Sequence, residues 1–108
     1  MEQLLSLPEI PTAVFCYNDL TAIGALTAIR QRGLKVPEDV SVVGFDDLAI
    51  ASFTQPPLTT VRQPKHQMGR AATEMLLNLL EESTPGSVRK VQGELIVRDS
   101  AAPPKPKA

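Results

Sequence analysis

The chain has 108 residues, which is enough for one small domain and too few for two. Apolar residues make up 43% and charged residues 21%, a composition typical of globular proteins and not of disordered ones. The 11 Lys and Arg are balanced by 12 Asp and Glu, and this net charge of −1 gives no electrostatic reason to expect nucleic-acid binding by this segment.

Cysteine and histidine are too scarce for most metal or covalent chemistry. Cys16 and His66 are single residues of their types, so we expect no intrachain disulfide, no metal site and no Cys–His or Ser–His–Asp arrangement. No stretch approaches the ~20 apolar residues of a membrane span, and the first residues lack the features of a signal peptide. We therefore predict no cofactor, no metal, no membrane contact and a cytoplasmic location.

The first half of the chain predicts a βαβ unit. The apolar run at residues 12–17 suits a strand buried on both faces, as in a parallel sheet. Asn18 and Asp19 are good N-cap residues for a helix that ends before Gly33, where a left-handed backbone costs least. A second strand is expected at residues 40–45, which completes a right-handed unit.

The second half predicts short strands and one long helix. A strand is expected at residues 58–61, and a helix from about residue 65 to 82, because its apolar residues recur at steps of three and four. This apolar stripe consists of Met68, Ala71, Ala72, Met75, Leu76, Leu79 and Leu80. Residues 88–91 and 95–97 are weaker strand candidates, and residues 101–108, with three prolines, are expected to form a disordered tail.

Polar residues follow both strands of the predicted βαβ unit. Asn18 comes directly after the first strand, and Asp46 and Asp47 come after the second. Ligands of parallel α/β sheets bind beyond the carboxyl ends of the strands, so we expect Asn18 and Asp46 to face one cleft. An amide and a carboxylate there could hold the hydroxyls of a neutral sugar. Spacing alone leaves a second interpretation open, in which both residues only cap the segments that follow them.

Three stretches carry a more specific pattern. They are PTAVFCYND at residues 11–19, GLKVPEDVSVVGFDD at residues 33–47 and PLTTVRQP at residues 57–64. Together they resemble the LacI/GalR family of transcription regulators, and the similarity extends from Leu4 to about Ala102. The resemblance implies an α/β fold: a partial type I periplasmic-binding-protein-like fold with a parallel βαβ core, one extra amphipathic helix and C-terminal strands.

The resemblance also implies roles for individual residues. Asp46, Asn18 and Gln63, in that order of preference, match positions at which the family contacts its effector. Gln63 could instead only satisfy backbone groups in a crossover between two lobes. Family members dimerise through their cores, and two stretches match the usual contact regions, with ordinary core packing as the alternative for each. The residues concerned are Ile23 and Leu26 in the first helix, and Ile50 and Phe53 in the segment after Asp47.

For the whole chain, the resemblance implies part of a regulator. Residues 4–100 are expected to be the C-terminal portion of an effector-binding and dimerisation core, with a helix-turn-helix DNA-binding domain absent from the chain. The expected partners are a small-molecule effector, a sugar, and a second copy, with DNA contacted only through the absent domain. Because most of the first lobe is also absent, the helix at residues 65–82 lacks the surface on which the family packs it. We therefore expect the chain to self-associate or repack, and to bind sugar poorly alone.

Three other interpretations remain open at this point. The chain could be a fragment of a solute-binding protein of a sugar transporter, which shares the core fold. It could also be a free-standing half-core that pairs with other regulators. Glycoside hydrolysis by Asp46 and Asp47 is the enzyme alternative, but adjacent residues rarely flank one substrate bond, so we predict that the chain is not an enzyme.

Overall fold

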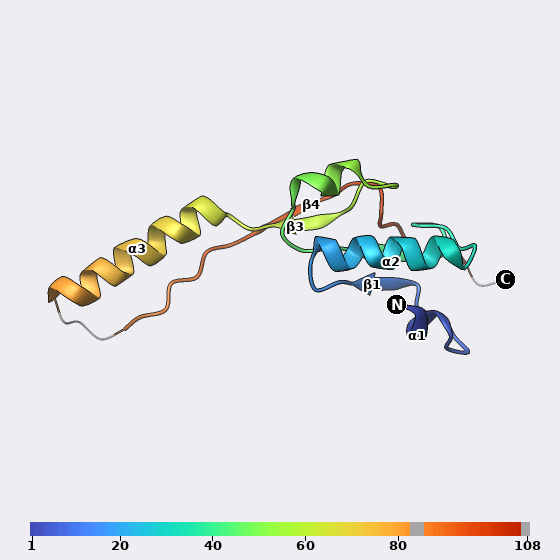
Figure 1. Cartoon of the computed structure of the whole chain (residues 1–108), viewed down its shortest axis with the longest axis horizontal. Coiled ribbons are helices and arrows are strands. Elements are labelled where there is room, and N and C mark those ends of the chain that lie inside the picture. Colours follow the sequence, from blue (N-terminus) through green and yellow to red (C-terminus); the bar gives the residue numbers. More distant parts are fainter. Residues whose placement is uncertain (83–85, 107–108) are drawn as a thin grey trace. The chain divides into compact units, whose positions relative to one another are not determined.

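The computed structural model describes residues 1–82 and 86–106 (Figure 1). They divide into two compact units, one built from Met1–Arg62 with the stretch that starts at Leu95, and the other from Gln63–Glu94. The elements in chain order are α1 (Glu2–Leu5), β1 (Ala13–Phe15), α2 (Asp19–Gln31), β2 (Ser41–Val43), the 3-10 helix η1 (Ala49–Phe53), β3 (Thr60–Arg62), α3 (Lys65–Glu82) and β4 (Glu94–Ile96). No helix of the described residues is long and apolar enough to cross a membrane.

The βαβ unit predicted from the sequence is present in the first unit. β1 and β2 run parallel, with Val14 opposite Val42, and α2 connects them. α2 begins after Asn18, whose side chain accepts a hydrogen bond from the backbone N–H of Thr21. The chain leaves the helix at Gly33 with a φ of 75°, a left-handed conformation that glycine adopts without strain.

The expectation that the first strand is buried on both faces is wrong. Phe15 at the end of β1 is 70% exposed, and Tyr17 just beyond it is 87% exposed. Among the described residues β1 hydrogen-bonds to β2 alone, so it is the edge strand of this unit. The apolar run predicted burial correctly only for the side of the strand that faces the core, where Cys16 is buried and Val14 is half-buried.

β3 continues the parallel arrangement on the other side of β2. Isolated parallel bridges join Val43 to Thr59 and Asp46 to Arg62. The backbone N–H of Gly44 donates to the carbonyl of Thr59 over 2.9 Å. The strand predicted at residues 58–61 is therefore present, shifted toward the carboxyl end to Thr60–Arg62.

Only one of the two candidate C-terminal strands forms. β4 overlaps the candidate at residues 95–97 and pairs with β3. Residues 88–91 form no strand, and Val88 is 88% exposed. Their β-forming side chains were misleading, because a strand also needs a hydrogen-bonding neighbour, and Arg89 instead pairs with Glu74 of α3 over 3.3 Å.

The core lies between α2 and the strands of the first unit. Ile29 of α2, Val42 of β2 and Leu58 before β3 have no exposed surface. A buried serine, Ser100, lies beside this core. Its backbone carbonyl accepts from the N–H of Val42, and its hydroxyl accepts from the N–H of Thr59, each over 2.8 Å. The hydroxyl also donates to the carbonyl of Val42, so one side chain joins β2 to the start of β3.

The expected tail has neither helix nor strand over its described part, residues 101–106. It is nevertheless attached at two points. Ala102 exchanges two hydrogen bonds with the side chain of Ser41, and Lys105 forms an ion pair with Asp39. Residues 107 and 108, which belong to the same predicted tail, lie outside the described residues.

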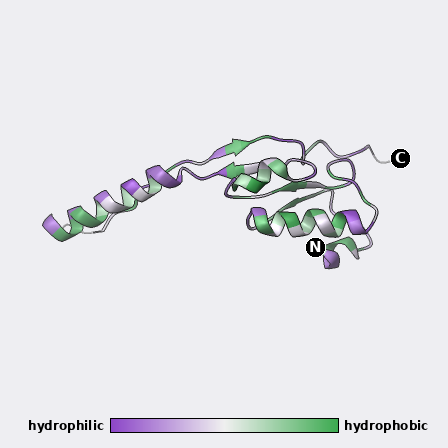
Figure 2. Ribbon diagram, turned by 45° about the horizontal axis from the view of Figure 1, so that its top comes forward, coloured by the Kyte–Doolittle hydropathy of each residue, from purple (hydrophilic) through white to green (hydrophobic). Residues whose placement is uncertain are grey.

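The second unit contains α3 and the extended stretch that follows it. The predicted helix at residues 65–82 is confirmed, because α3 spans Lys65–Glu82. None of the described side chains between Gln63 and Glu94 is fully buried, and Leu80 is 72% exposed. Hydropathy colouring shows apolar residues distributed along this helix (Figure 2).

Candidate functional site

The turns that follow β1 and β2 meet at the carboxyl edge of the strands. The backbone N–H of Cys16 donates to the carbonyl of Val43 over 2.8 Å, and that of Asp19 donates to the carbonyl of Phe45 over 3.0 Å. These bonds extend the parallel ladder past the last strand residues. They place Asn18 and Asp46 at one edge of the unit, as the order of the strands predicts.

Asn18 is half-buried, and its amide oxygen caps α2. That oxygen accepts from the N–H of Thr21 over 2.8 Å, so the capping interpretation of this residue describes a real contact. The cap occupies only the acceptor end of the side chain. A ligand at this edge would therefore meet Asn18 as a hydrogen-bond donor, through its amide nitrogen.

Asp46 is half-buried and has an unusual backbone. Its φ is 116°, and that of Asp47 is 55°, so two consecutive residues adopt backbone conformations that are rare for residues other than glycine. The strand ladder holds this turn, since the N–H of Asp46 donates to the carbonyl of Val61 over 2.8 Å. Strained backbone of this kind is concentrated at functional sites, where surrounding contacts keep one conformation.

Asp47 anchors the turn that presents Asp46. One carboxylate oxygen lies 2.8 Å from Nε of Arg62, and the other lies 2.8 Å from Nη2 of Arg98. The Asp47 side chain is only 6% exposed, and burial by itself would raise the pKa of its carboxyl group. Hydrogen bonds and charge from the two arginines outweigh this and lower the pKa. Asp47 is thus an ionised structural group, with its oxygens already engaged.

Asp19 stabilises the same edge through hydrogen bonds with Thr60 and Leu48. Its carboxylate is fully buried, accepting from the hydroxyl of Thr60 over 2.6 Å and from the N–H of Leu48 over 2.7 Å. A Cβ on Gly44 would lie 2.3 Å from one Asp19 oxygen and 2.9 Å from the Leu58 side chain. Gly44 therefore leaves the space in which this carboxylate sits. The sequence predicted Asp19 only as a possible N-cap residue, and its role in supporting the edge was not predicted.

Two aromatic rings lie beside the polar turns and were also missed. Phe15 ends β1 and Phe45 follows β2, and their ring centroids are 6.5 Å apart with an interplanar angle of 31°. Phe45 is half-buried, whereas Phe15 presents most of its surface to solvent. An apolar ring next to polar groups is the composition of most small-molecule sites. The sequence could have indicated these rings, because Phe15 and Phe45 each lie within three residues of the polar residues that follow a predicted strand.

Gln63 is the first residue of the second unit and is half-buried. Its carbonyl accepts from the N–H of Lys65 over 2.8 Å. Its contact with an effector stays a prediction.

The residues predicted at a dimer interface differ in accessibility. Leu26 is only 5% exposed and belongs to the core, which matches the core-packing alternative. Ile23 is half-buried. Ile50 and Phe53 in η1 are 49% and 83% exposed and offer apolar surface to a partner.

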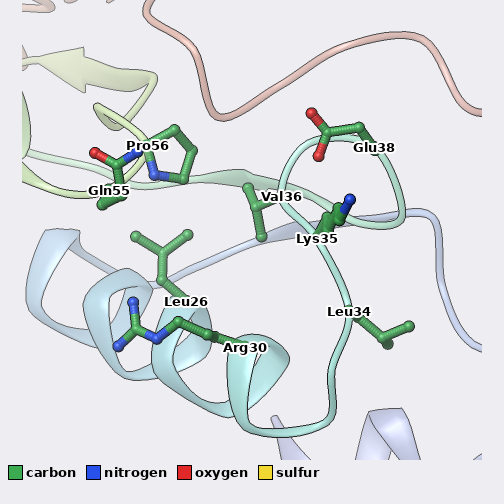
Figure 3. A pocket seen from close by; sticks show the side chains of 8 residues that line it. All are labelled: Leu26, Arg30, Leu34, Lys35, Val36, Glu38, Gln55 and Pro56. Carbon is green, nitrogen blue, oxygen red and sulfur yellow. The ribbon is translucent and has the colours of Figure 1, made fainter.

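The cavity beside α2 is not this polar edge. It measures about 240 Å³, and Leu26 and Arg30 of α2, Val36 before β2 and Pro56 after η1 are among its lining residues (Figure 3). It lies by the end of α2 and the start of β2, whereas Asn18 and Asp46 follow the ends of β1 and β2. Nor does the described part of the chain group three or more acidic, Cys or His side chains in a way that could hold a metal.

The sequence of this chain is similar to known proteins of one family. The sequence pattern of the periplasmic binding protein-like domain matches residues 1–101. The repressor CytR of Escherichia coli K12 is 48% identical over 101 residues, covering 93% of this chain and 30% of CytR. The chain therefore spans about 30% of the length of this relative, which is a transcription repressor and not an enzyme.

Solved structures are similar over most of the chain. The dimeric lac repressor bound to operator and the anti-inducer ONPF aligns with a TM-score of 0.84 and 35% identity, over 92% of this chain and 35% of the repressor. A LacI family regulator of Lactobacillus casei with bound sucrose aligns with a TM-score of 0.74 and 38% identity, over 93% of this chain and 38% of the regulator.

Proposed function

This chain belongs to the periplasmic binding protein-like domain family, and we propose that it forms part of the effector-binding core of a LacI-type transcription regulator. The LacI-family resemblance noted in the sequence is confirmed by these relatives, as is the α/β fold class. In this proposal residues 4–100 belong to the core. DNA is contacted by a helix-turn-helix domain outside the chain, in the cytoplasm.

The observation that carries the proposal is the meeting of two polar turns at one sheet edge. Asp46 supplies an acceptor for ligand hydroxyl groups, and the amide nitrogen of Asn18 supplies a donor. Phe15 adds an exposed apolar ring at the end of β1. A polyhydroxylated ring with alternating polar rims and apolar faces fits these three groups, and we therefore propose a sugar as the effector. The sucrose-bound relative supports this class of ligand.

The rigid support beneath the turns also favours binding. Asp47 is held by Arg62 and Arg98, and Asp19 is held by Thr60 and the backbone of Leu48. A carboxylate whose turn is fixed before the ligand arrives loses little entropy on binding. Gln63 is the third proposed effector contact.

This edge is only one side of a binding site. Sites for small molecules bury most of the ligand surface, and the chain spans about 30% of its curated relative. We therefore expect weak binding by the chain alone, with a dissociation constant in the millimolar range or above.

The test is an NMR titration of the labelled chain with sucrose or glucose up to high millimolar concentration. We expect shifts of backbone signals in the turns that carry Asn18 and Asp46, and their loss in Asp46→Ala. Glu9→Ala, at an exposed position before β1, is the matched control and should behave as wild type. Shifts confined to the cavity beside α2, or shifts unaffected by Asp46→Ala, would contradict the proposed site. Micromolar binding by the chain alone would contradict the proposal that this edge is only one side of the binding site.

We also propose that Ile50 and Phe53 contact a second copy of the core, through which effector binding is coupled to the spacing of two DNA-binding domains. Both side chains are exposed on η1, which directly follows the turn of Asp46 and Asp47. A movement of that turn on ligand binding would reach the proposed interface through one short segment. Phe53→Asp should weaken this contact in sedimentation experiments and leave unfolding of the chain unchanged, whereas unaltered self-association would exclude η1 as the interface.

A further inference from the structure

The two arginines that contact Asp47 differ in their exposure to solvent. Arg62, the last residue of β3, has a side chain that is 54% exposed and contacts Asp47 through Nε. Arg98, two residues after β4, has a side chain that is only 18% exposed, and its Nη2 lies 2.8 Å from the other carboxylate oxygen. Solvent screens an exposed ion pair, and holding a long exposed side chain in one geometry costs entropy. We therefore expect the contact with Arg98 to hold Asp47 more firmly.

Arg98 is itself attached to the segment before β3. The second terminal nitrogen of its guanidinium group, Nη1, donates to the carbonyl of Leu58 over 2.9 Å. Its backbone N–H donates to the hydroxyl of Thr59, also over 2.9 Å. Because the guanidinium group is planar and rigid, these bonds give Asp47 a fixed connection to Leu58, a residue of the core.

The turn that carries Asp46 depends on such support, because its backbone is strained. Asp46 and Asp47 have φ values of 116° and 55°, and conformations of this kind persist only where surrounding contacts impose them. The N–H of Asp46 donates to the carbonyl of Val61 over 2.8 Å. The N–H of Asp47 has only a long hydrogen bond, 3.4 Å, to the hydroxyl of Thr60. At Asp47 the main constraint therefore comes from the carboxylate and the arginines that hold it.

We propose that Arg98 is a positioning residue for the effector, which rests on the proposed role of Asp46 in effector binding. Acting through Asp47, it keeps the turn of Asp46 in the conformation that binds, whereas Arg62 contributes little. Arg98 lies in the stretch that rejoins the first unit at Leu95, after the chain has passed through the second unit. Because coupling between two contacts is reciprocal, a ligand that stabilises the turn also stabilises the attachment of this returning stretch.

Hydrogen exchange of the chain without ligand tests the positioning role. Arg98→Gln and Arg62→Gln each remove one charge next to Asp47 and keep a polar side chain, so the second variant is the matched control. We expect Arg98→Gln to accelerate exchange of the Asp46 N–H about 10-fold or more, and Arg62→Gln about 3-fold or less. The rates are taken relative to the N–H of Ile29, a fully buried residue of α2, so that a general loss of stability affects both. Equal acceleration by the two variants, or a larger effect of Arg62→Gln, would overturn the proposal.

A double variant tests whether Arg98 acts through Asp47. In Asp47→Asn the arginine has already lost the carboxylate, so the addition of Arg98→Gln should accelerate exchange of the Asp46 N–H by less than about 2-fold more. If the two substitutions instead multiplied their separate effects, Arg98 would support the turn by another route, and the proposal would be wrong.

Titration with sucrose, followed by NMR, tests the connection to binding. In Arg98→Gln we expect the dissociation constant to rise about 3-fold or more, because the binding conformation of the turn is less populated. Arg62→Gln should bind as wild type does, and unchanged binding by Arg98→Gln would count against the proposal. If sucrose shifts no signal of the wild-type turn, the proposed effector site fails. The exchange rates of the ligand-free chain then still decide whether Arg98 positions the turn.

Discussion

The two units of this chain differ in how their polar and apolar groups are satisfied. In the unit that contains the βαβ core, Asp19, Thr60 and Ser100 are fully buried, and all three make hydrogen bonds. In the unit that contains α3, none of the described side chains is fully buried, and large apolar side chains face solvent. The first unit gains its structure from long-range contacts within the chain. The second has local helical structure and leaves several large apolar side chains exposed.

Removal of the Asp19 carboxylate would damage the first unit most. Asp19→Ala leaves the Thr60 hydroxyl and the Leu48 N–H without their present acceptor, and we expect the free energy of unfolding to fall by about 2–5 kcal/mol. Urea denaturation followed by circular dichroism measures the change. Glu9→Ala, an exposed acidic residue, should alter it by less than about 0.5 kcal/mol. Equal values for the two variants would show that the buried Asp19 carboxylate does not stabilise the first unit.

Ser100 should be the next most sensitive position. Ser100→Ala removes the hydroxyl that joins the carbonyl of Val42 to the N–H of Thr59, with an expected loss of about 1–3 kcal/mol. Ser87→Ala, in the exposed stretch of the second unit, is the matched control and should be near neutral. If Ser100→Ala proved as mild as Ser87→Ala in thermal unfolding, the serine would not be holding β2 to β3.

Acid should weaken the first unit through Asp47. The two arginines lower the pKa of this carboxyl group below its value in the unfolded chain, about 3.9. Its contribution to stability is therefore fully present above that value and is lost as the pH falls through the lower, folded pKa. Asp47→Asn should flatten the dependence of unfolding free energy on pH below about 4.

Asp39, the control for this acid effect, also has a lowered pKa, caused first by its hydrogen bond from Lys105. Its contact with Lys105 is exposed, so Asp39→Asn should flatten the acid dependence less. If Asp39→Asn flattened the acid dependence more than Asp47→Asn did, Asp47 would not be the anchor of the turn.

The smallest effect is expected on α3. Leu80 is 72% exposed, so Leu80→Ala should change the unfolding free energy of dilute, monomeric chain by less than about 0.5 kcal/mol. Ile29→Ala, at a fully buried position of α2, should cost about 2–5 kcal/mol in the same assay. A large cost for Leu80→Ala at high dilution would mean that a surface of the chain itself already covers this helix.

Local patterns predicted most of the elements. The βαβ unit followed from an apolar run, a good N-cap at Asn18 and a left-handed residue at Gly33, all of which act over a few residues. The helix at Lys65–Glu82 followed from its period, and its residues Leu76, Leu79 and Leu80 are exposed. Periodicity could not tell that β1 is an edge strand, because this depends on which strands lie beside it in the described part of the chain.

The sequence predicted which residues lie at the candidate site, but it did not predict the contacts that hold them there. The placement of Asn18 and Asp46 at one edge follows from the parallel order of the strands. The partners of Asp47 and Asp19 do not, because Arg98 and Thr60 are distant in sequence and no local pattern links them. The helical spacing of Leu26 was compatible with either a core or an interface position. The structure shows that Leu26 is buried in the core.

The position of Ser100 also has a consequence for how the protein is made. Val42 is synthesised 58 residues before the serine that pairs with it, a delay of roughly 3–12 s at ordinary rates of translation. Until Ser100 leaves the ribosome, the carbonyl and N–H of Val42 lack the partners they have in the finished fold. The nascent strand therefore keeps an open edge for that interval, while α3, whose contacts are local, is already complete. The time for which this edge stays open is thus set by the separation of Val42 and Ser100 along the sequence, and not by the stability of the finished unit.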